Sequence, residues 1–335
     1  MRAAVVTGPG QLSVADRAEP GRGDHAIVAV QAGGICGTDL KIIHGDVPAR
    51  TPVILGHEII GEIAVAAPGS AMPAGTRVVV DPSICCGTCA VCRHDLPQLC
   101  PNGGLMGRDD DGGFAGLIAV PDARLHPLPA DLPATDAVML QVLSTCVHAQ
   151  TRLRLQLGQT AVVIGLGVTG LLHISLLRAS GIRLIVGVSR SAARRALALE
   201  LGAAAVAPPS AALALVAEVT GGAGADIAID CAGQAETLAQ AMTAAGAGGS
   251  VLIFGTVTPS ADRMPTYDWY RKELTLVNTR ASRPRDFSTA IAAVRDGLVS
   301  PGQLVTASYP LEETAAAVAA AGTPGEIKVM LTMSG

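Results

Sequence analysis

The pattern of hydrophobic and polar positions changes about midway along the chain. Before residue 150, short apolar runs such as 26–30 and 77–80 lie between Gly, Pro and polar residues, which is typical of strands joined by turns. From about Gln159, short apolar runs alternate with Ala- and Leu-rich segments of helical length. This second pattern predicts a parallel sheet covered by helices on both faces. The expected strands of this sheet are 160–164, 183–188, 204–207, 226–230, 250–254 and 274–278.

Length and charge narrow the class of protein. The 335 residues are enough for two domains of about 150 residues, each with a complete core. The 24 Lys and Arg against 28 Asp and Glu give a net charge of −4, without the basic run that a nucleic-acid binder needs. The most apolar stretch, 161–172, is too short to span a membrane, and no secretory signal is visible at the N-terminus. We therefore expect a cytoplasmic protein that binds neither nucleic acid nor membrane.

Five of the eight cysteines are crowded between residues 85 and 100. In a cytoplasmic protein such crowding favours a metal over disulfides, because thiols there are kept reduced. A structural zinc site is closed and tetrahedral, and four of these cysteines have the spacing that such a site requires: Cys86, Cys89, Cys92 and Cys100. A redox CxxC pair or a chance cluster is the alternative. Cys85 is then a spare thiol that could compete with Cys86, although the spacing favours Cys86.

A glycine-rich turn follows the first strand of the predicted sheet. Its GxGxxG motif consists of Gly165, Leu166, Gly167, Val168 and Gly170, with Thr169 between the last two. A strand before the motif and a helix after it provide the tight turn, the close backbone approach and the helix N-terminus that a pyrophosphate requires. The sequence therefore predicts a doubly wound Rossmann sheet that binds a dinucleotide.

The end of the second strand of this sheet bears on the choice of dinucleotide. It falls at Ser189, nineteen residues after Gly170, where an NAD site carries Asp or Glu for the ribose 2′-hydroxyl. The acid is absent here, and Ser189, Arg190 and Arg194 offer hydroxyl and guanidinium donors instead. Because such donors bind a phosphate by charge-assisted hydrogen bonds, we expect NADP(H). The alternative is that both arginines are ordinary solvated side chains.

A further group of potential metal ligands lies in the first half of the chain. Cys36 supplies a thiolate, and the neighbours His57 and Glu58 supply an imidazole and a carboxylate. Taken separately, a lone Cys is more often a small core residue and a His-Glu pair more often lies on the surface. These three residues therefore indicate a metal site only when they are considered together with the other motifs.

Together, the motifs resemble those of the zinc-containing medium-chain alcohol and polyol dehydrogenases. Their order along the chain is CGTD from Cys36, GHE from Gly56, the four cysteines, GGFA from Gly112, Ser144-Thr145, the glycine-rich turn, GADIAIDCAG from Gly224 and RKEL from Arg271. The resemblance covers nearly the whole chain. It implies a β-rich GroES-like catalytic domain at 1–150 with a structural-zinc lobe at 85–100, a Rossmann domain at 151–285, and a return of 286–335 to the catalytic domain.

The same resemblance implies a second, catalytic zinc. Cys36 and His57 match the metal ligands of the family, and Glu58 matches a carboxylate that binds the zinc directly or through an intervening group. The position of the third ligand, which is Cys or Glu in the family, is occupied by Gln141. A neutral amide oxygen is a weaker donor than either, so Gln141 would be the weakest ligand of this set.

Further roles follow from the resemblance residue by residue. Thr38 matches the hydroxyl that passes on the proton of the substrate, and Lys41 stands where many relatives have a relay His. Thr145 would contact the nicotinamide and Lys328 the pyrophosphate. The family also implies a homodimer or homotetramer.

The expected activity is a zinc-dependent transfer of hydride between NADP(H) and a secondary alcohol or polyol, or the corresponding ketone or aldehyde. Gln141 leaves open a zinc-independent reductase of an activated C=C or C=N bond on the same scaffold. A hypothesis from another class is a nucleotide-binding sensor without turnover. The intact set of Cys36, Thr38 and His57 argues against both alternatives.

Overall fold

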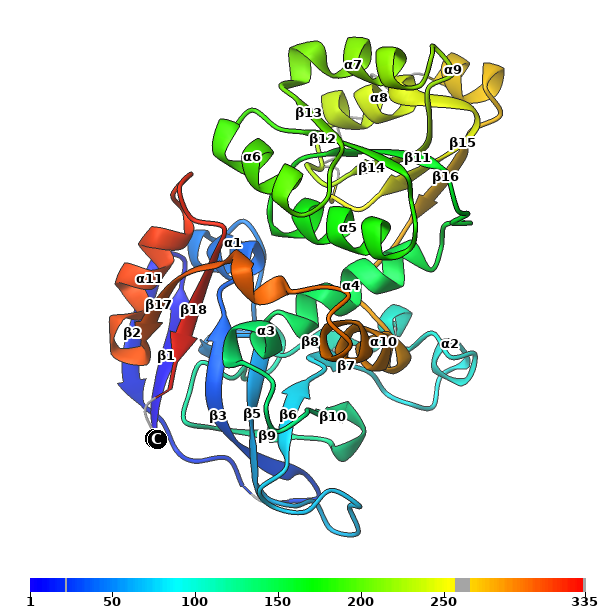
Figure 1. Ribbon diagram of the computed structural model, residues 1–335. Coiled ribbons are helices and arrows are strands. Elements are labelled where there is room, and N and C mark those ends of the chain that lie inside the picture. Colours follow the sequence, from blue (N-terminus) through cyan, green and yellow to red (C-terminus); the bar gives the residue numbers. More distant parts are fainter. Residues whose placement is uncertain (22, 257–265, 334–335) are drawn as a thin grey trace. The chain divides into compact units, whose positions relative to one another are not determined.

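The computed structural model describes residues 1–21, 23–256 and 266–333, which form two compact units (Figure 1). The first unit contains Met1–Ser144 and Ala281–Gly335, and the second contains Thr145–Arg280. The C-terminal segment therefore belongs to the same unit as the N-terminal part of the chain. In the part of the chain that the structure describes, no helix is long and apolar enough to cross a bilayer.

Sheets dominate the first unit. A seven-stranded sheet has the order β10-β6-β5-β3-β18-β17, with β9 also paired to β3, and a three-stranded sheet has the order β2-β1-β4. The strands are β1 (Arg2–Gly8), β2 (Gln11–Asp16), β3 (Ala26–Gly34), β4 (Val53–Ile54), β5 (Glu58–Val65), β6 (Arg77–Val80), β9 (Leu117–Val120), β10 (Leu125–Pro127), β17 (Val305–Pro310) and β18 (Lys328–Thr332). A separate short pair consists of β7 (Ser83–Ile84) and β8 (Gly104–Leu105). β18 runs antiparallel to β3, so the last strand of the chain completes the sheet that the N-terminal strands begin.

Close packing in this unit depends on small residues at a few positions. The aliphatic core includes Leu55, Ile59 and Ile63, and it surrounds the fully buried Phe114. Gly61 lies where β5 meets β3, and a Cβ there would stand 2.3 Å from the carbonyl oxygen of Ala29. The helices of this unit are α1 (Gly37–His44), α2 (Ala90–Arg93), α3 (Ala134–Val138), α10 (Pro284–Arg295) and α11 (Thr314–Ala321), and α4 (Leu140–Gln150) crosses the boundary between the units.

The second unit is a six-stranded parallel sheet with the order β13-β12-β11-β14-β15-β16. Numbered from its first strand, this is the order 3-2-1-4-5-6 of the doubly wound dinucleotide-binding fold, as predicted. The strands are β11 (Thr160–Ile164), β12 (Leu184–Val188), β13 (Ala205–Ala207), β14 (Ala225–Asp230), β15 (Ala245–Ile253) and β16 (Thr275–Asn278). The helices are α5 (Val168–Ala179), α6 (Ala192–Glu200), α7 (Ala212–Val219), α8 (Ala235–Ala244) and α9 (Thr266–Arg271).

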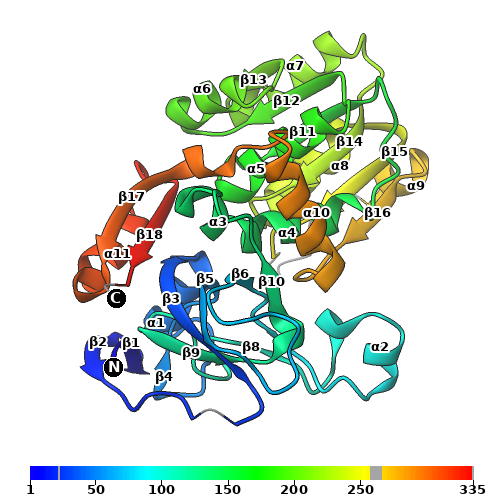
Figure 2. The same cartoon turned by 60° about the horizontal axis from the view of Figure 1, so that its bottom comes forward.

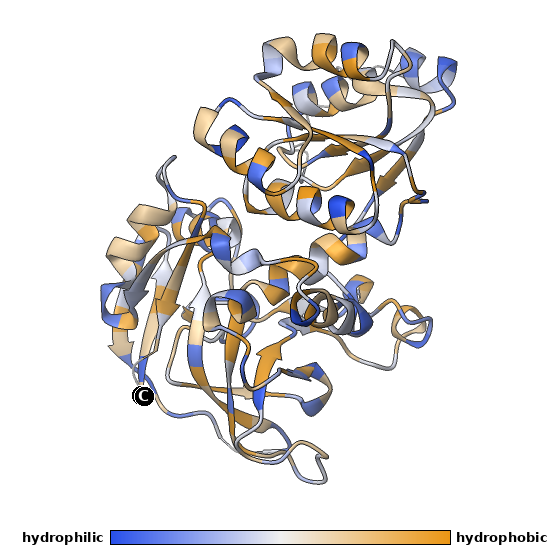
Figure 3. Ribbon diagram, viewed as in Figure 1, coloured by the Kyte–Doolittle hydropathy of each residue, from blue (hydrophilic) through white to orange (hydrophobic). Residues whose placement is uncertain are grey.

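Helices cover both faces of this sheet, with α5 and α6 on one face and α7 and α8 on the other (Figures 1 and 2). Figure 3 shows that the hydrophobic residues concentrate along the strands, while hydrophilic residues recur on the outer turns of the helices. The predicted strands match the observed ones within a residue or two except at β15, which begins at Ala245 rather than at residue 250. The extra residues 245–249 read AGAGG, so they carry no apolar pattern, and the pairing with β14 shifts register there.

A buried histidine joins α4 to α5 within the second unit. His173 is fully buried, and its Nδ1 lies 3.1 Å from Nε2 of Gln150. The same amide donates to the carbonyl oxygen of His173, also at 3.1 Å, and the imidazole packs edge-on against Phe254. Burial lowers the pKa of His173 to about 3, so the imidazole stays neutral in the folded protein at all but strongly acidic pH.

We expect His173 to make the protein acid-sensitive. Between pH 6.5 and about 3 the unfolded chain binds a proton at this residue and the folded chain does not, so the free energy of unfolding falls as the pH is lowered. At pH 5 the loss is about 2 kcal/mol, and above pH 6.5 the residue contributes no pH dependence. Denaturant unfolding at several pH values, in the wild type and in His173→Gln, isolates the effect. Parallel pH profiles for the two proteins would contradict a neutral, buried His173.

Candidate functional site

Strand pairing brings the three predicted ligands of the catalytic zinc together. Cys36 is the residue before α1, two positions after the end of β3, and His57 and Glu58 stand at the start of β5. Because β3 and β5 are antiparallel with Gly34 opposite Glu58, the two segments meet at the same end of the sheet. The ligand atoms of Cys36, His57 and Glu58 all lie within 4.8 Å of one another. A thiolate, an imidazole and a carboxylate at this spacing fit a zinc ion.

Asp39 orients the imidazole of this group. Its carboxylate is fully buried, and Oδ1 lies 3.4 Å from Nδ1 of His57, while Oδ2 accepts a 2.8 Å hydrogen bond from the backbone N–H of Cys36. With Nδ1 turned to Asp39, Nε2 is the nitrogen that remains for a metal. Burial by itself lowers the pKa of His57, but the charges of Asp39 and Cys36 outweigh it and raise the pKa well above its usual value. Sequence reasoning assigned no role to Asp39, although its place three residues after Cys36 was a signal.

Glu58 has a cationic partner from the other end of the chain. Nζ of Lys328, the first residue of β18, forms an ion pair with Oε2 of Glu58 and donates a 3.1 Å hydrogen bond to the carbonyl oxygen of Ile35. Lys328 and Glu58 are only 3% and 1% exposed. Burial lowers the pKa of Lys328, but Glu58 and Cys36 outweigh it and raise the pKa above its usual value. The contact of Lys328 with a pyrophosphate, which the sequence suggested, stays a prediction.

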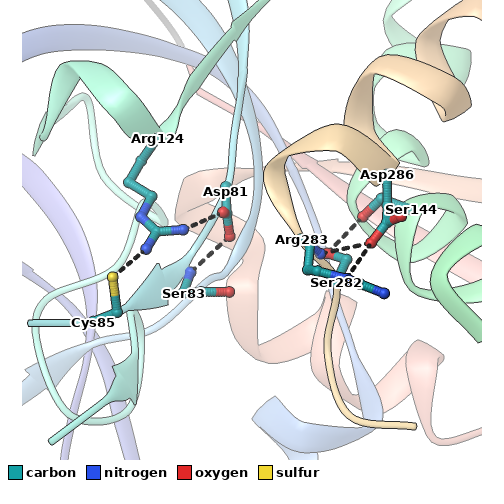
Figure 4. Close-up of polar contacts among 8 residues, drawn as sticks. All are labelled: Asp81, Ser83, Cys85, Arg124, Ser144, Ser282, Arg283 and Asp286. Atoms are coloured by element: carbon teal, nitrogen blue, oxygen red, sulfur yellow. Dashed lines mark hydrogen bonds and ion pairs between the residues drawn. The ribbon is translucent and has the colours of Figure 1, made fainter. Parts of the chain in front are cut away.

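The remaining predicted residues of this site lie on α1 and α4. Thr38 is half-buried in the first turn of α1, and its Oγ1 accepts a 3.9 Å contact from Sγ of Cys36. Gln141 is buried in α4, where its backbone carbonyl accepts a 2.7 Å hydrogen bond from Oγ of Ser144. Oγ of Ser144 also lies 3.0 Å from Oγ of Ser282 (Figure 4). Whether the amide of Gln141 binds a metal stays a prediction, as does the contact of Thr145 with the nicotinamide.

The lobe at 85–100 has the geometry of a tetrathiolate metal site. The sulfurs of Cys86 and Cys92 are 4.0 Å apart, those of Cys89 and Cys100 are 3.9 Å apart, and those of Cys100 and Cys86 are 3.6 Å apart. A tetrahedron of thiolates around zinc, with Zn–S bonds of about 2.3 Å, has edges of about 3.8 Å. Hydrogen bonds from the backbone N–H groups of Thr88 and Cys89 lower the pKa of Cys86 to about 5, which favours the thiolate that a metal needs.

The glycine-rich turn of the second unit has the shape of a phosphate cradle. Gly165 follows β11 with a φ of +92°, and a Cβ on Gly170 would lie 1.9 Å from the carbonyl oxygen of Gly165. A Cβ on Gly167, by contrast, would meet nothing within 4 Å, so the backbone is open there. Gly167 is also the residue before α5, and no side chain caps the first N–H groups of this helix. These groups are available to an anion.

The turn after β12 holds the residues expected to bind a 2′-phosphate. Oγ of Ser189 accepts a 3.2 Å hydrogen bond from the backbone N–H of Ser191. Ser191 in turn caps α6, because its side chain accepts a hydrogen bond from the backbone N–H of Arg194. Arg195 fixes the turn, since its Nη1 donates to the backbone carbonyl oxygens of Ser189 and Arg190, at 2.6 and 3.0 Å. The Arg190 side chain is exposed and Arg194 is half-buried. The sequence analysis had not given Arg195 this role.

Comparison with known proteins gives matches along nearly the whole chain. Residues 22–130 match the family model described as the alcohol dehydrogenase GroES-like domain, and residues 168–296 match the one described as zinc-binding dehydrogenase. A sorbitol dehydrogenase of Halalkalibacterium halodurans is 30% identical over 340 residues, covering 99% of each chain. A D-altritol 5-dehydrogenase of Agrobacterium fabrum is 33% identical, covering 90% of this chain and 89% of that protein.

Solved structures agree with these matches. A zinc-binding dehydrogenase of Sinorhizobium meliloti, solved with NADP bound, is 32% identical with a TM-score of 0.92, covering 99% of this chain and 98% of that one. An alcohol dehydrogenase of Thermus sp. ATN1 is 28% identical with a TM-score of 0.94, and the match covers all of both chains.

The buried ion pair of Lys328 and Glu58 leads to a prediction for the metal-free protein. Lys328→Met leaves the Glu58 carboxylate buried without its cation, so we expect the free energy of unfolding to fall by about 3–5 kcal/mol. Lys328→Arg keeps the positive charge and is the conservative control. Denaturant unfolding of the single variants and of Glu58→Gln/Lys328→Met gives the coupling between the two residues. Additive effects would show that the pair contributes nothing.

Proposed function

The chain belongs to the family of zinc-containing medium-chain alcohol and polyol dehydrogenases, and from this premise we propose that it is a zinc-dependent, NADP(H)-linked oxidoreductase of secondary alcohols or polyols. In the oxidising direction the CH–OH group of the substrate loses a hydride to the nicotinamide and a proton to the protein, and becomes a ketone or aldehyde. The observation that carries the proposal is the group of the half-buried Cys36 and the buried His57 and Glu58, with Asp39 and Lys328 as partners of the last two.

The donor set supports a catalytic metal at this group. Zinc, when bound, acts as a Lewis acid on the C–O group of the substrate, next to the carbon that exchanges the hydride with the nicotinamide. Cys36 and His57 would hold the ion, with Gln141 as the proposed additional ligand. The ammonium of Lys328 competes with the metal for Glu58, because the ion pair already satisfies that carboxylate. With Glu58 off the metal, a Cys36 thiolate and two neutral ligands leave the site a net charge of +1, which makes a stronger Lewis acid than a neutral site.

The proton would leave through α1. Thr38 is placed next to Cys36, and we propose that its hydroxyl takes the proton from the substrate hydroxyl and passes it outward. Lys41 is exposed on the same helix, one turn further along, where it could receive the proton on the solvent side.

We propose a structural zinc for the four-cysteine lobe, since its sulfur–sulfur distances leave no open position for a substrate. Reduced thiolates are needed there, which supports a cytoplasmic location. We also propose that the protein forms a homodimer or homotetramer and binds a small-molecule alcohol or ketone.

NADP(H) is the proposed cofactor because Ser189 and Arg190 stand where an acidic residue would repel a 2′-phosphate. The related protein of Sinorhizobium meliloti, which was solved with NADP, is consistent with this choice. Gly165, Leu166, Gly167, Val168 and Gly170 would bind the pyrophosphate through backbone N–H groups, and Thr145 would contact the nicotinamide.

Removing the Cys36 thiolate tests the proposed activity. We expect wild-type protein to interconvert NADP and NADPH with at least one substrate from a panel of secondary alcohols, polyols and ketones. In Cys36→Ser, kcat should fall by about 100-fold or more, because the metal contributes several kcal/mol of transition-state stabilisation. Steady-state assays and zinc analysis are made on the same samples. The matched control is Cys85→Ser, which should keep both zinc and turnover. Full turnover by Cys36→Ser would instead favour the zinc-independent reductase.

The cofactor preference has its own test. In Arg190→Ala, the ratio of kcat/KM for NADP to that for NAD should fall by about 10- to 100-fold, because a charge-assisted hydrogen bond to the 2′-phosphate is lost. Ser189→Asp should lower the same ratio further, because the new carboxylate would repel the 2′-phosphate. Arg183→Ala is the control, since this exposed arginine precedes the opposite end of β12. An unchanged ratio in Arg190→Ala would contradict a role for Arg190 in binding the 2′-phosphate.

A further inference from the structure

We propose that Arg124 determines which cysteines bind the lobe metal, by holding Cys85 out of the ligand set; the inference rests on the proposed lobe zinc. Cys85 and Cys86 are neighbours in the sequence, so both thiols lie close along the chain to the other three cysteines of the lobe. A site that needs four thiolates and has five cysteines available requires a device that excludes one of them. The spacing of the cysteines favours Cys86, but it does not by itself keep the thiol of Cys85 away from the metal.

The guanidinium of Arg124 is held in a fixed position between two partners (Figure 4). Its Nη1 donates to Oδ2 of Asp81 at 2.6 Å, and its Nη2 donates to Sγ of Cys85 at 2.6 Å. Asp81 is fully buried, and its Oδ1 accepts a 3.0 Å hydrogen bond from the backbone N–H of Ser83. The backbone N–H of Asp81 also donates a 2.8 Å hydrogen bond to the carbonyl oxygen of Arg124. Arg124 itself is 8% exposed, so the cation cannot swing into solvent without losing Asp81.

The two neighbouring sulfurs consequently face different environments. Among the described residues, the lobe group whose ligand atoms lie within 4.8 Å of one another contains Cys86 and does not contain Cys85. Cys86 is 3.6 Å from the sulfur of Cys100 and 4.0 Å from that of Cys92, whereas Cys85 accepts the hydrogen bond of Arg124. The contacts of the folded chain thus already separate the thiol of Cys85 from that of Cys86.

An arginine suits this task better than a lysine would. Its planar fork reaches the Asp81 carboxylate with one nitrogen and the Cys85 sulfur with another, while a single ammonium has no such fixed geometry. Moving Cys85 to the metal would break a charge-assisted hydrogen bond and leave the guanidinium with only Asp81. Arg124 is therefore a positioning residue, which acts on the metal site through the cysteine it excludes.

Cys85 is also open to a chemical probe. Cys85, Cys86 and Arg124 border a cavity of about 970 Å³ in the first unit, which admits a small alkylating reagent such as iodoacetamide. The state of each thiol can therefore be read in the intact, zinc-loaded protein by peptide mass mapping.

The decisive experiment exchanges the two cysteines, in a Cys36→Ser background in which only the lobe binds zinc. We expect Cys86→Ser to lose the lobe zinc, because Arg124 keeps Cys85 away. Adding Arg124→Gln should release Cys85 to replace Cys86, so that the double variant binds zinc about 10- to 100-fold more tightly than Cys86→Ser alone. In this variant Cys85 becomes protected from iodoacetamide. Two controls should not recover zinc. The first is Cys86→Ser/Arg108→Gln, which removes an arginine that pairs with Asp109 and not with Asp81. The second is the triple variant Cys86→Ser/Arg124→Gln/Cys85→Ser, which lacks the thiol that would replace Cys86.

A single substitution tests the same proposal where the double variant fails to fold. In Arg124→Gln with Cys86 intact, both cysteines compete for the metal, so alkylation of Cys86 should rise while Cys89, Cys92 and Cys100 stay protected. Zinc retention by Cys86→Ser alone, or unchanged protection of Cys86 in Arg124→Gln, would overturn the role of Arg124. A lobe without zinc in the parent protein would overturn the lobe metal itself, and the hydride-transfer assay reports separately on the proposed activity.

Discussion

The antiparallel pairing of β3 with β5 is the constraint on which the candidate catalytic site depends. It places Gly34 opposite Glu58, so that the turn after β3 and the start of β5 present Cys36 and His57 to the same small volume. A slip of one residue in this register would turn the side chains of one strand to the other face of the sheet. The same strand β3 also pairs with β18, which delivers Lys328 to Glu58. Three distant segments of sequence are thus brought together by backbone hydrogen bonds before any metal is involved.

The charges of the site are balanced in pairs within the first unit. Asp39 faces His57, and Lys328 faces Glu58, with both carboxylates almost completely buried. Buried charges are costly unless they are paired, so these contacts explain how so polar a group survives at the end of an aliphatic sheet. Arg124 and Asp81 repeat the arrangement beside the lobe. Asp39 and Lys328, the partners of the proposed metal ligands, are themselves held by backbone groups of Cys36 and Ile35.

Much of the fold could be predicted because its signals are local. The parallel strands β11, β12 and β16 are apolar runs between turn residues, and the glycines at 165 and 170 each have a separate steric reason. The start of β15 could not be predicted, because a Gly-Ala segment has no hydrophobic pattern. The pairing of Lys328 with Glu58 was equally out of reach, since the two residues are 270 positions apart and only the sheet order brings them together. The role of Arg124 toward Cys85 required a side-chain position that no motif contains.

Phe114 sets a limit on how this protein can vary. Its ring fills the space that two glycines leave, since a Cβ on Gly33 would lie 2.8 Å from the ring and one on Gly56 would lie 2.3 Å from it. Both glycines are chain neighbours of the site, one just before Gly34 and the other just before His57. Any larger residue at either position would displace an aromatic ring that is sealed in the core. Variation next to the candidate site is therefore restricted to glycine at these two positions, while positions whose side chains do not touch the ring are free of this limit.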